Sequence, residues 1–290
     1  MVSSSTDKTT SRDATIFPVI LTQNNLVTSA NNNVYRYSFP GSATFSNSKV
    51  AVSTIQIYYS WQNVNVQNSN NTCSIIFPVG AGTVTVAITF PDGSYSIADL
   101  NSYLQFIMIQ NNYYLIDSSG QYVYYLELVE NSVRYSVQLN TYPVPTVLPA
   151  GWTNPGWVLP AVGNTPQLTV PSTNFRNLIG FSGGIYPSPA QATAYSALST
   201  TTPQLSVVSS VLVGCNLINN RLANPRTLLY SFSPGGTQYG NLIESNAYQY
   251  SWVDIQDGTY STIEITLYDQ SFNPLKIIDT NLVIFLLIKS

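Results

Sequence analysis

Two pairs of acidic residues lie close enough in the sequence to suggest acid–base chemistry. Asp254 and Asp257 stand beside one predicted turn, and Glu127 and Glu130 stand beside another. Two carboxylates that flank a glycosidic bond can hydrolyse it, provided that their separation in space suits the reaction. The alternative is structural, with Asp257 serving turn geometry and the other three side chains facing solvent. We favour the structural interpretation, because spacing along the chain does not fix the separation.

Residue types of the common nucleophilic and metal centres are scarce. The 290 residues include no histidine, which excludes Ser-His-Asp and Cys-His catalytic groups and all histidine metal ligands. Cys73 and Cys215 match no zinc spacing. Asp92-Gly93 lacks the alternating acidic ligands of a calcium loop and is interpreted as a turn. The sequence therefore predicts no catalytic residue, no metal site, no cofactor and no enzymatic activity.

Aromatic side chains on loops offer another chemistry, because they can stack on sugars. Trp152, Trp157, Tyr186 and Tyr195 lie in a proline-rich part of the chain. They indicate either a glycan site or packing beneath a large insertion, and we favour packing. Asn70-Asn71-Thr72 is a glycosylation sequon. We expect it to be unused, because Met1 is followed by Ser and Thr rather than by an apolar signal segment.

Charge is unusually low and nearly balanced. Charged residues make up 8% of the chain, and ten Lys plus Arg against thirteen Asp plus Glu give a net charge of −3. No strong field toward nucleic acid or an anionic membrane is expected, and the longest apolar run, residues 282–288, is too short to span a bilayer. Tyr, with 21 copies, and Asn, Ser and Thr fill the polar positions. This composition suits contact with other protein, although β-rich chains also favour Tyr and Thr.

The few charges are segregated along the chain. Residues 131–243 contain no acidic side chain and four arginines, while acidic side chains cluster in residues 244–279. Such segregation could give complementary patches on neighbouring subunits, where charge sets the register of contact. Chance among few charges is the alternative. The four arginines are Arg134, Arg176, Arg221 and Arg226.

Apolar side chains alternate with period two over most of the chain, which predicts β-strands. In residues 49–61 the apolar phase shifts from even to odd positions, which predicts a bulge near Ser53-Thr54. Asp257-Gly258 predicts a two-residue hairpin between strands at 248–255 and 260–268. Residues 281–289 are apolar on both faces and predict a central, covered strand. Further strands are expected at 34–39, 73–77, 83–90, 132–139, 205–218 and 227–232, with a hairpin at 113–129.

One segment has helical periodicity. Ser96 can cap a helix, with Asp99 three residues later, and apolar side chains at helical spacing continue to Met108. Residues 141–203 contain ten of the 17 prolines, which predicts irregular backbone with at most a short helical turn at 175–181. Strands that do not alternate with helices indicate an all-β antiparallel sandwich or jelly roll.

Three segments resemble the minor capsid, or penton, proteins of virophages and related Polinton-like double-stranded DNA viruses. They are residues 90–101 (FPDGSYSIADLN), residues 174–181 (NFRNLIGF) followed by Tyr186-Pro187, and residues 265–270 (ITLYDQ) followed by 273–275 (NPL). The resemblance implies an all-β fold, a single eight-stranded antiparallel jelly roll with a Pro-rich insertion domain containing one helix. Three strands before the middle segment and five after it would make the eight.

The resemblance also implies a domain plan and a role. We expect a mobile arm at residues 1–13, the jelly roll at 14–90 and 205–290, and the insertion at 91–204. Five copies would form the penton at each vertex of an icosahedral capsid, beside a double jelly-roll major capsid protein, with no specific nucleic acid and no membrane as partner. The protein would be made in the host cell without a signal peptide and reside in the virion, its cysteines reduced. The alternative is a carbohydrate- or receptor-binding β-sandwich of a spike or fibre head.

Overall fold

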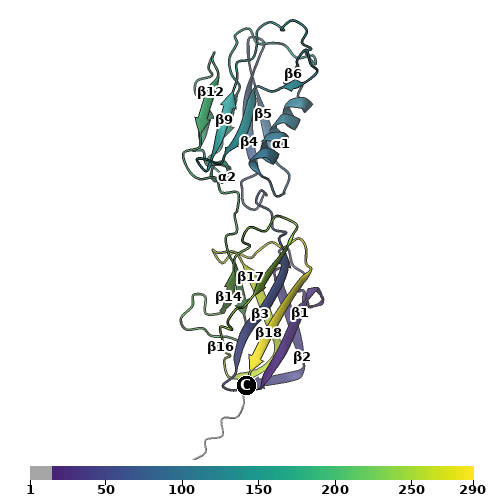
Figure 1. The fold of residues 1–290 in the computed structure, drawn as a ribbon, viewed down its shortest axis with the longest axis vertical. Helices are drawn as coiled ribbons and strands as arrows, with labels where there is room; N and C mark the ends of the chain where they lie inside the picture. Colours follow the sequence, from purple (N-terminus) through teal and green to yellow (C-terminus); the bar gives the residue numbers. More distant parts are fainter. Residues whose placement is uncertain (1–14) are drawn as a thin grey trace, which may run out of the picture. The chain divides into compact units, whose positions relative to one another are not determined.

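The computed structural model describes residues 15–290, which form two compact units. Unit 2, Gln62–Val207, is inserted in the chain between the two parts of unit 1, residues 15–61 and 208–290 (Figure 1). Antiparallel strands dominate both units, which confirms the all-β class. The arm expected at residues 1–13 lies outside the described residues.

Unit 1 consists of two antiparallel sheets. Its elements, in chain order, are β1 (Ile16–Thr22), the 3-10 helix η1 (Gln23–Asn25), β2 (Val34–Phe45), β3 (Lys49–Tyr58), β13 (Val211–Cys215), β14 (Leu228–Phe232), β15 (Leu242–Asn246), β16 (Val253–Asp254), β17 (Gly258–Tyr268) and β18 (Leu282–Lys289). The first sheet has the order β1-β18-β3-β15, with β16 also pairing with β3. The second has the order β14-β13-β17-β2.

The pairing of the eight longer strands of unit 1 follows a simple rule. The first pairs with the last (β1 with β18), the second with the seventh (β2 with β17), the third with the sixth (β3 with β15) and the fourth with the fifth (β13 with β14). The strands therefore behave as one long antiparallel hairpin, rolled so that β18 also pairs with β3 and β17 with β13. Unit 2 enters between the third strand and the fourth.

The bulge predicted in β3 is confirmed. Phe285 of β18 lies opposite Thr54 and Leu286 opposite Val52, so Ser53 is the additional residue. The extra residue reverses which positions point inward. As a result Val52 before the bulge and Ile55 after it are both buried.

The hairpin predicted at Asp257-Gly258 is wrong. The strand before it is only Val253–Asp254, which pairs with β3 of the first sheet, whereas β17 pairs with β2 and β13 of the second. The Asp257 carboxylate instead accepts a hydrogen bond from the Asn47 backbone N–H (2.9 Å), in the turn between β2 and β3. A turn dipeptide predicts a change of chain direction, but it does not predict that the two flanking strands pair with each other.

Unit 2 combines small sheets with one substantial helix. Its elements are β4 (Thr72–Val79), β5 (Gly82–Thr89), α1 (Ile97–Gln110), β6 (Leu115–Ile116), β7 (Tyr122–Val123), β8 (Leu126–Asn131), β9 (Ser136–Thr141), β10 (Gln167–Val170), α2 (Phe175–Ile179), β11 (Gly184–Tyr186) and β12 (Tyr195–Leu198). The sheets have the orders β11-β10-β4-β5, β12-β9-β8 and β6-β7. Because β4 pairs with β10 and β5, both strands belong to unit 2, which is longer than the insertion expected at 91–204.

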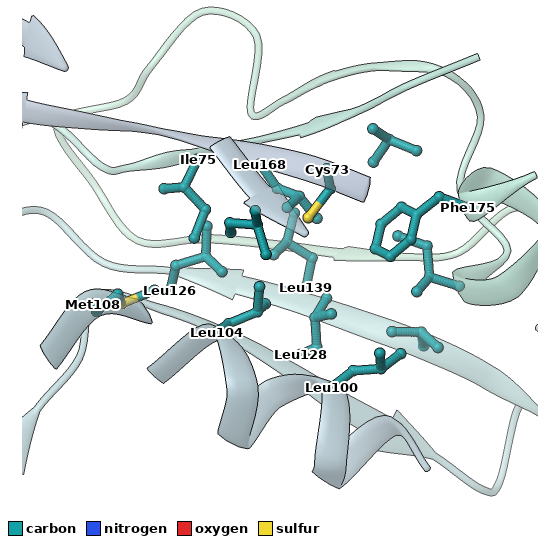
Figure 2. Packing of buried hydrophobic residues seen from close by; sticks show 14 of the residues in the cluster. Cys73, Ile75, Leu100, Leu104, Met108, Leu126, Leu128, Leu139, Leu168 and Phe175 are labelled. Atoms are coloured by element: carbon teal, nitrogen blue, oxygen red, sulfur yellow. The ribbon is translucent and has the colours of Figure 1, made fainter. Parts of the chain in front are cut away.

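Helix α1 begins and packs as its sequence predicts. The Ser96 side chain accepts a hydrogen bond from the Asp99 backbone N–H (3.1 Å), and the Asp99 carboxylate accepts from the Ser96 N–H (2.9 Å). Hydrogen bonds from Ser96 lower the pKa of Asp99. The buried face of α1 includes Leu100, Leu104 and Met108, which lie against β8 and β9 in the core of unit 2 (Figure 2).

Each unit buries one free cysteine. Cys73 lies in the core of unit 2 (Figure 2) and Cys215 in that of unit 1. Burial raises the pKa of both thiols, that of Cys215 to about 12. Since only a thiolate reacts with labelling reagents, each cysteine becomes reactive when its own unit opens.

A buried asparagine joins the two ends of unit 2. The side-chain NH₂ of Asn63 donates to the carbonyl oxygens of Tyr95 (2.8 Å) and Leu205 (2.9 Å), and its side-chain oxygen accepts from the Tyr95 N–H (2.9 Å). Asn70 supports it, because its NH₂ donates to the Asn63 carbonyl oxygen (2.7 Å) and its oxygen accepts from the Asn65 N–H (3.0 Å). One side chain thus connects the first residues of unit 2, the segment before α1 and the last residues.

Replacement of this asparagine by leucine should open unit 2. Asn63→Leu leaves two carbonyl groups and one N–H without their partner, and each such buried group costs about 1–3 kcal/mol. We expect unit 2 to lose about 3 kcal/mol of stability and Cys73 to react with a thiol reagent about 100-fold faster in native buffer. The labelling rate of Cys73, followed by mass spectrometry, measures this.

The matched control is Gln67→Leu, at an exposed position of the same loop. It should leave the rate at Cys73 unchanged, and neither variant should alter labelling of Cys215 in unit 1. Equal rates at Cys73 in the Asn63→Leu and Gln67→Leu proteins would refute the role given to Asn63.

Candidate interaction surface

The structure does not bring together the two glutamates of the predicted acidic pair Glu127 and Glu130. Glu127 and Glu130 lie three positions apart on β8, so their side chains leave opposite faces of the strand. The Glu127 carboxylate accepts hydrogen bonds from the Asn140 NH₂ and the Tyr142 hydroxyl, each at 3.0 Å. The pair therefore cannot flank one substrate from the same side.

The aspartates have separate structural partners. Asp254 forms an exposed ion pair with Lys49 (2.9 Å), while Asp257 accepts from Asn47 as described above. An exposed pair of this kind contributes less than about 1 kcal/mol. Asp92 accepts a hydrogen bond from the Val66 N–H (3.0 Å). Across residues 15–290 no group of three or more acidic, Cys or His side chains could hold a metal ion.

The aromatic side chains of the proline-rich segment belong to the core of unit 2 rather than to a surface platform. Trp157 is buried, stacks edge-on to Phe77, and its ring N–H donates to the Tyr114 carbonyl oxygen (2.9 Å). The other three, Trp152, Tyr186 and Tyr195, are partly buried and pack against the same core. This arrangement agrees with the packing interpretation of these residues.

The asparagine of the predicted glycosylation sequon, Asn70, takes part in the hydrogen bonding of the folded chain. Asn70 is buried, and its side-chain nitrogen donates to the Asn63 carbonyl oxygen. The folded chain therefore leaves this nitrogen inaccessible to a glycan. No helix within residues 15–290 is long and apolar enough to cross a membrane.

The first sheet of unit 1 exposes apolar side chains on its outer face. On β18 the even-numbered side chains are buried between the sheets, while Val283, Phe285 and Leu287 point outward and are partly exposed. The strand expected to be covered on both faces is therefore central but not fully covered. On β1, Ile20 lies opposite Phe285 and Pro18 opposite Leu287.

We call these outward side chains, together with Ile16, the outer stripe. Ile16 and Ile20 are 49% and 47% exposed, whereas Val19 and Leu21, on the opposite face of the strand, are buried. Strand β1 ends the sheet order, so its second edge has no strand partner within the described residues. An exposed apolar patch at a sheet edge marks a surface for contact with other protein.

A hollow of about 350 Å³ continues the outer stripe toward β15. It lies where β1 and β3 end and β15 and β18 begin, and its apolar walls are Tyr58, Leu242 and Val283. Leu242 is 44% exposed. The four arginines of residues 131–243 are divided between the units, because Arg134 and Arg176 belong to unit 2 and Arg221 and Arg226 to unit 1. Sequence reasoning missed the outer stripe and the hollow.

Comparison with known proteins finds no matching family model and no matching curated protein. Two solved structures are similar over nearly the whole chain. The mavirus penton protein is 8% identical with a TM-score of 0.46, over 96% of this chain and 99% of that one. A chain from the cryo-EM structure of the Sputnik virophage is 12% identical with a TM-score of 0.38, over 96% of this chain and 98% of that one. The resemblance noted in the sequence and this similarity concern the same group of viral proteins.

Two neighbouring substitutions on β1 test the assignment of its faces. Leu21→Ala removes a fully buried side chain and should cost about 2–5 kcal/mol of unfolding free energy. Ile20→Ala removes an outward, half-exposed one and should cost less than about 1 kcal/mol. Urea unfolding measures both. A cost for Ile20→Ala as large as that for Leu21→Ala would mean that the stripe already packs within its own chain.

Proposed function

We propose that this chain is a structural capsid protein that forms the homopentameric vertex capsomer, or penton, of an icosahedral viral capsid. The outer stripe carries the proposal. A lone chain gains nothing from leaving Ile16, Ile20 and Phe285 open to water, whereas a copy packed over them removes that apolar surface from solvent. The role requires no reaction, cofactor or metal.

The strand connectivity of unit 1 supports the capsid role. We infer that unit 1 is an eight-stranded jelly roll, the fold in which a long antiparallel hairpin rolls into two sheets. The pairing of first with last, second with seventh, third with sixth and fourth with fifth strand is the pattern such rolling produces. Unit 2 would then be the insertion domain, placed between the third and fourth strands and containing the proline-rich segment.

The low content of charged residues supports a protein that assembles with other protein chains rather than one that remains monomeric. With 8% charged residues, the surface of the chain is built largely from uncharged polar and apolar side chains. Interface centres are depleted in Lys, Glu and Asp and enriched in Tyr. We propose two partners of this kind, other copies of the same chain and a double jelly-roll major capsid protein around the vertex in the virion.

A ring of five copies sets a geometric requirement. Each copy must contact its two neighbours through different surfaces, because a contact that uses the same patch on both copies closes after two. The outer stripe would supply one of these surfaces. Each contact should bury more than about 1,000 Å² in total if the ring is stable outside the capsid.

Native mass spectrometry of the purified chain tests the proposal. We expect a species of about 159 kDa, five times the 31.8 kDa chain, because a vertex capsomer must close after five copies. A stable dimer or trimer as the largest species would contradict it, since neither closes on a five-fold axis. Sugar binding by a chain that forms no ring would instead support the spike or fibre-head alternative.

A further inference from the structure

A loop of unit 1 presents one fully exposed leucine between arginines. Leu222 lies between β13 and β14 and is 99% exposed, and Arg221 and Arg226 on the same loop are also exposed. Neither guanidinium has an ion-pair partner within residues 15–290. The loop is ordered by its own hydrogen bonds, because the Asn220 side-chain oxygen accepts from the Leu222 N–H (3.1 Å) and the Asn220 N–H donates to the Arg226 carbonyl oxygen (2.7 Å). Leu222 is thus held away from the body of its own chain.

The hollow on the outer face is suited to receive such a side chain. Its volume of about 350 Å³ exceeds what one leucine side chain fills, which leaves room for the flanking backbone. Tyr58, Leu242 and Val283 would contact the apolar group, while Gln56 and Asn281 provide polar side chains at the rim. The fully exposed Leu222 and the half-exposed Leu242 would then become buried together.

Charge around the hollow is opposite to charge around the leucine. Glu244 lies opposite Gln56 in the sheet, on the same outward face as Leu242, and is exposed. Asp279 lies two residues before the rim residue Asn281. The Asp279 carboxylate accepts hydrogen bonds from the Asn281 backbone N–H (3.0 Å) and side-chain NH₂ (2.8 Å). Loop and hollow are therefore complementary in charge as well as in polarity, and such charges fix the register of an interface.

We propose that Leu222 of one copy inserts into the hollow of the next, with Arg221 and Arg226 facing Glu244 and Asp279 of that neighbour. The inference rests on the proposed function, and it identifies the contact that closes the ring. Loop and hollow are different surfaces of one chain, so the contact is head-to-tail and repeats from copy to copy. Insertion into the hollow of its own chain is ruled out by the full exposure of Leu222.

Leu222→Asp should abolish the ring without affecting the fold. The side chain is fully exposed, so the melting temperature of the chain should stay within about 2 °C of the native value, while the new carboxylate would enter the apolar hollow near Glu244. The matched control is Val133→Asp, because Val133 is also an almost fully exposed apolar residue, at 95%, but lies in unit 2. Native mass spectrometry should show monomers for the first variant and the native ring for the second.

Reversal of the two charges tests the register. Arg221→Glu and Glu244→Lys should each raise the concentration needed for ring formation at least about tenfold at low ionic strength, because each places like charges together. The double variant Arg221→Glu, Glu244→Lys should regain most of the loss. If the effects of the two single variants on the concentration needed for ring formation simply add in the double variant, Arg221 and Glu244 do not face each other.

A mixing experiment isolates the head-to-tail contact. Leu222→Asp retains its hollow, and Leu242→Trp, which fills the hollow with a bulky side chain and offers no charge to an aspartate, retains its loop. Each alone should be monomeric, and an equimolar mixture should stop at a dimer of about 64 kDa, because only one loop–hollow contact can form.

The outcomes separate this inference from the proposed function. A native ring that persists in Leu222→Asp, or a mixture that forms no dimer, would overturn the loop–hollow contact and leave the penton proposal intact. A native chain that forms only dimers or trimers would instead contradict the penton proposal itself. Loss of the ring in Leu222→Asp but not in Val133→Asp, with the dimer in the mixture, supports both.

Discussion

Both ends of unit 2 meet at the Asn63 side chain, and the stability of that unit depends on this interaction. Its three hydrogen bonds connect the first residues of unit 2, the segment before α1 and Leu205 near its end. The group is buried, so these bonds form in a medium where loss of a partner is costly. The two ends of unit 2 are therefore joined within unit 2 itself, and the strands of unit 1 before and after the insertion pair with one another.

The sequence predicted those structural features that depend on residues close together in the chain. The capping residues Ser96 and Asp99 begin α1, and the change of apolar phase in β3 locates the bulge at Ser53. Strand partners were less accessible, because a β-strand is stabilised by neighbours far away in sequence. For this reason Asp257-Gly258 suggested a hairpin that does not exist, and β4 and β5 were expected to lie in unit 1 rather than in unit 2.

The sequence predicted a surface for contact with other protein, but it did not predict which residues form that surface. Low charge and segregated arginines indicated contact with other protein, and Arg221 and Arg226 do belong to the exposed loop on which the inferred contact depends. The outer stripe was hidden, because β1 and β18 are apolar on both faces, and that pattern is typical of strands covered on both sides. Only the burial of Leu21 and Ile284 beside the exposure of Ile20 and Phe285 separates the two faces.

In the proposed penton, another copy of the chain covers the outer face of the first sheet of unit 1. Hydroxyl-radical labelling read by mass spectrometry tests it at single residues, in the assembled and the dissociated protein. We predict that labelling of Ile20 and Phe285 falls at least about fivefold on assembly, as expected when a half-exposed side chain enters an interface, while buried Leu21 stays unlabelled in both states. Equal labelling of Ile20 and Phe285 in the two states would show that no neighbouring copy covers this face.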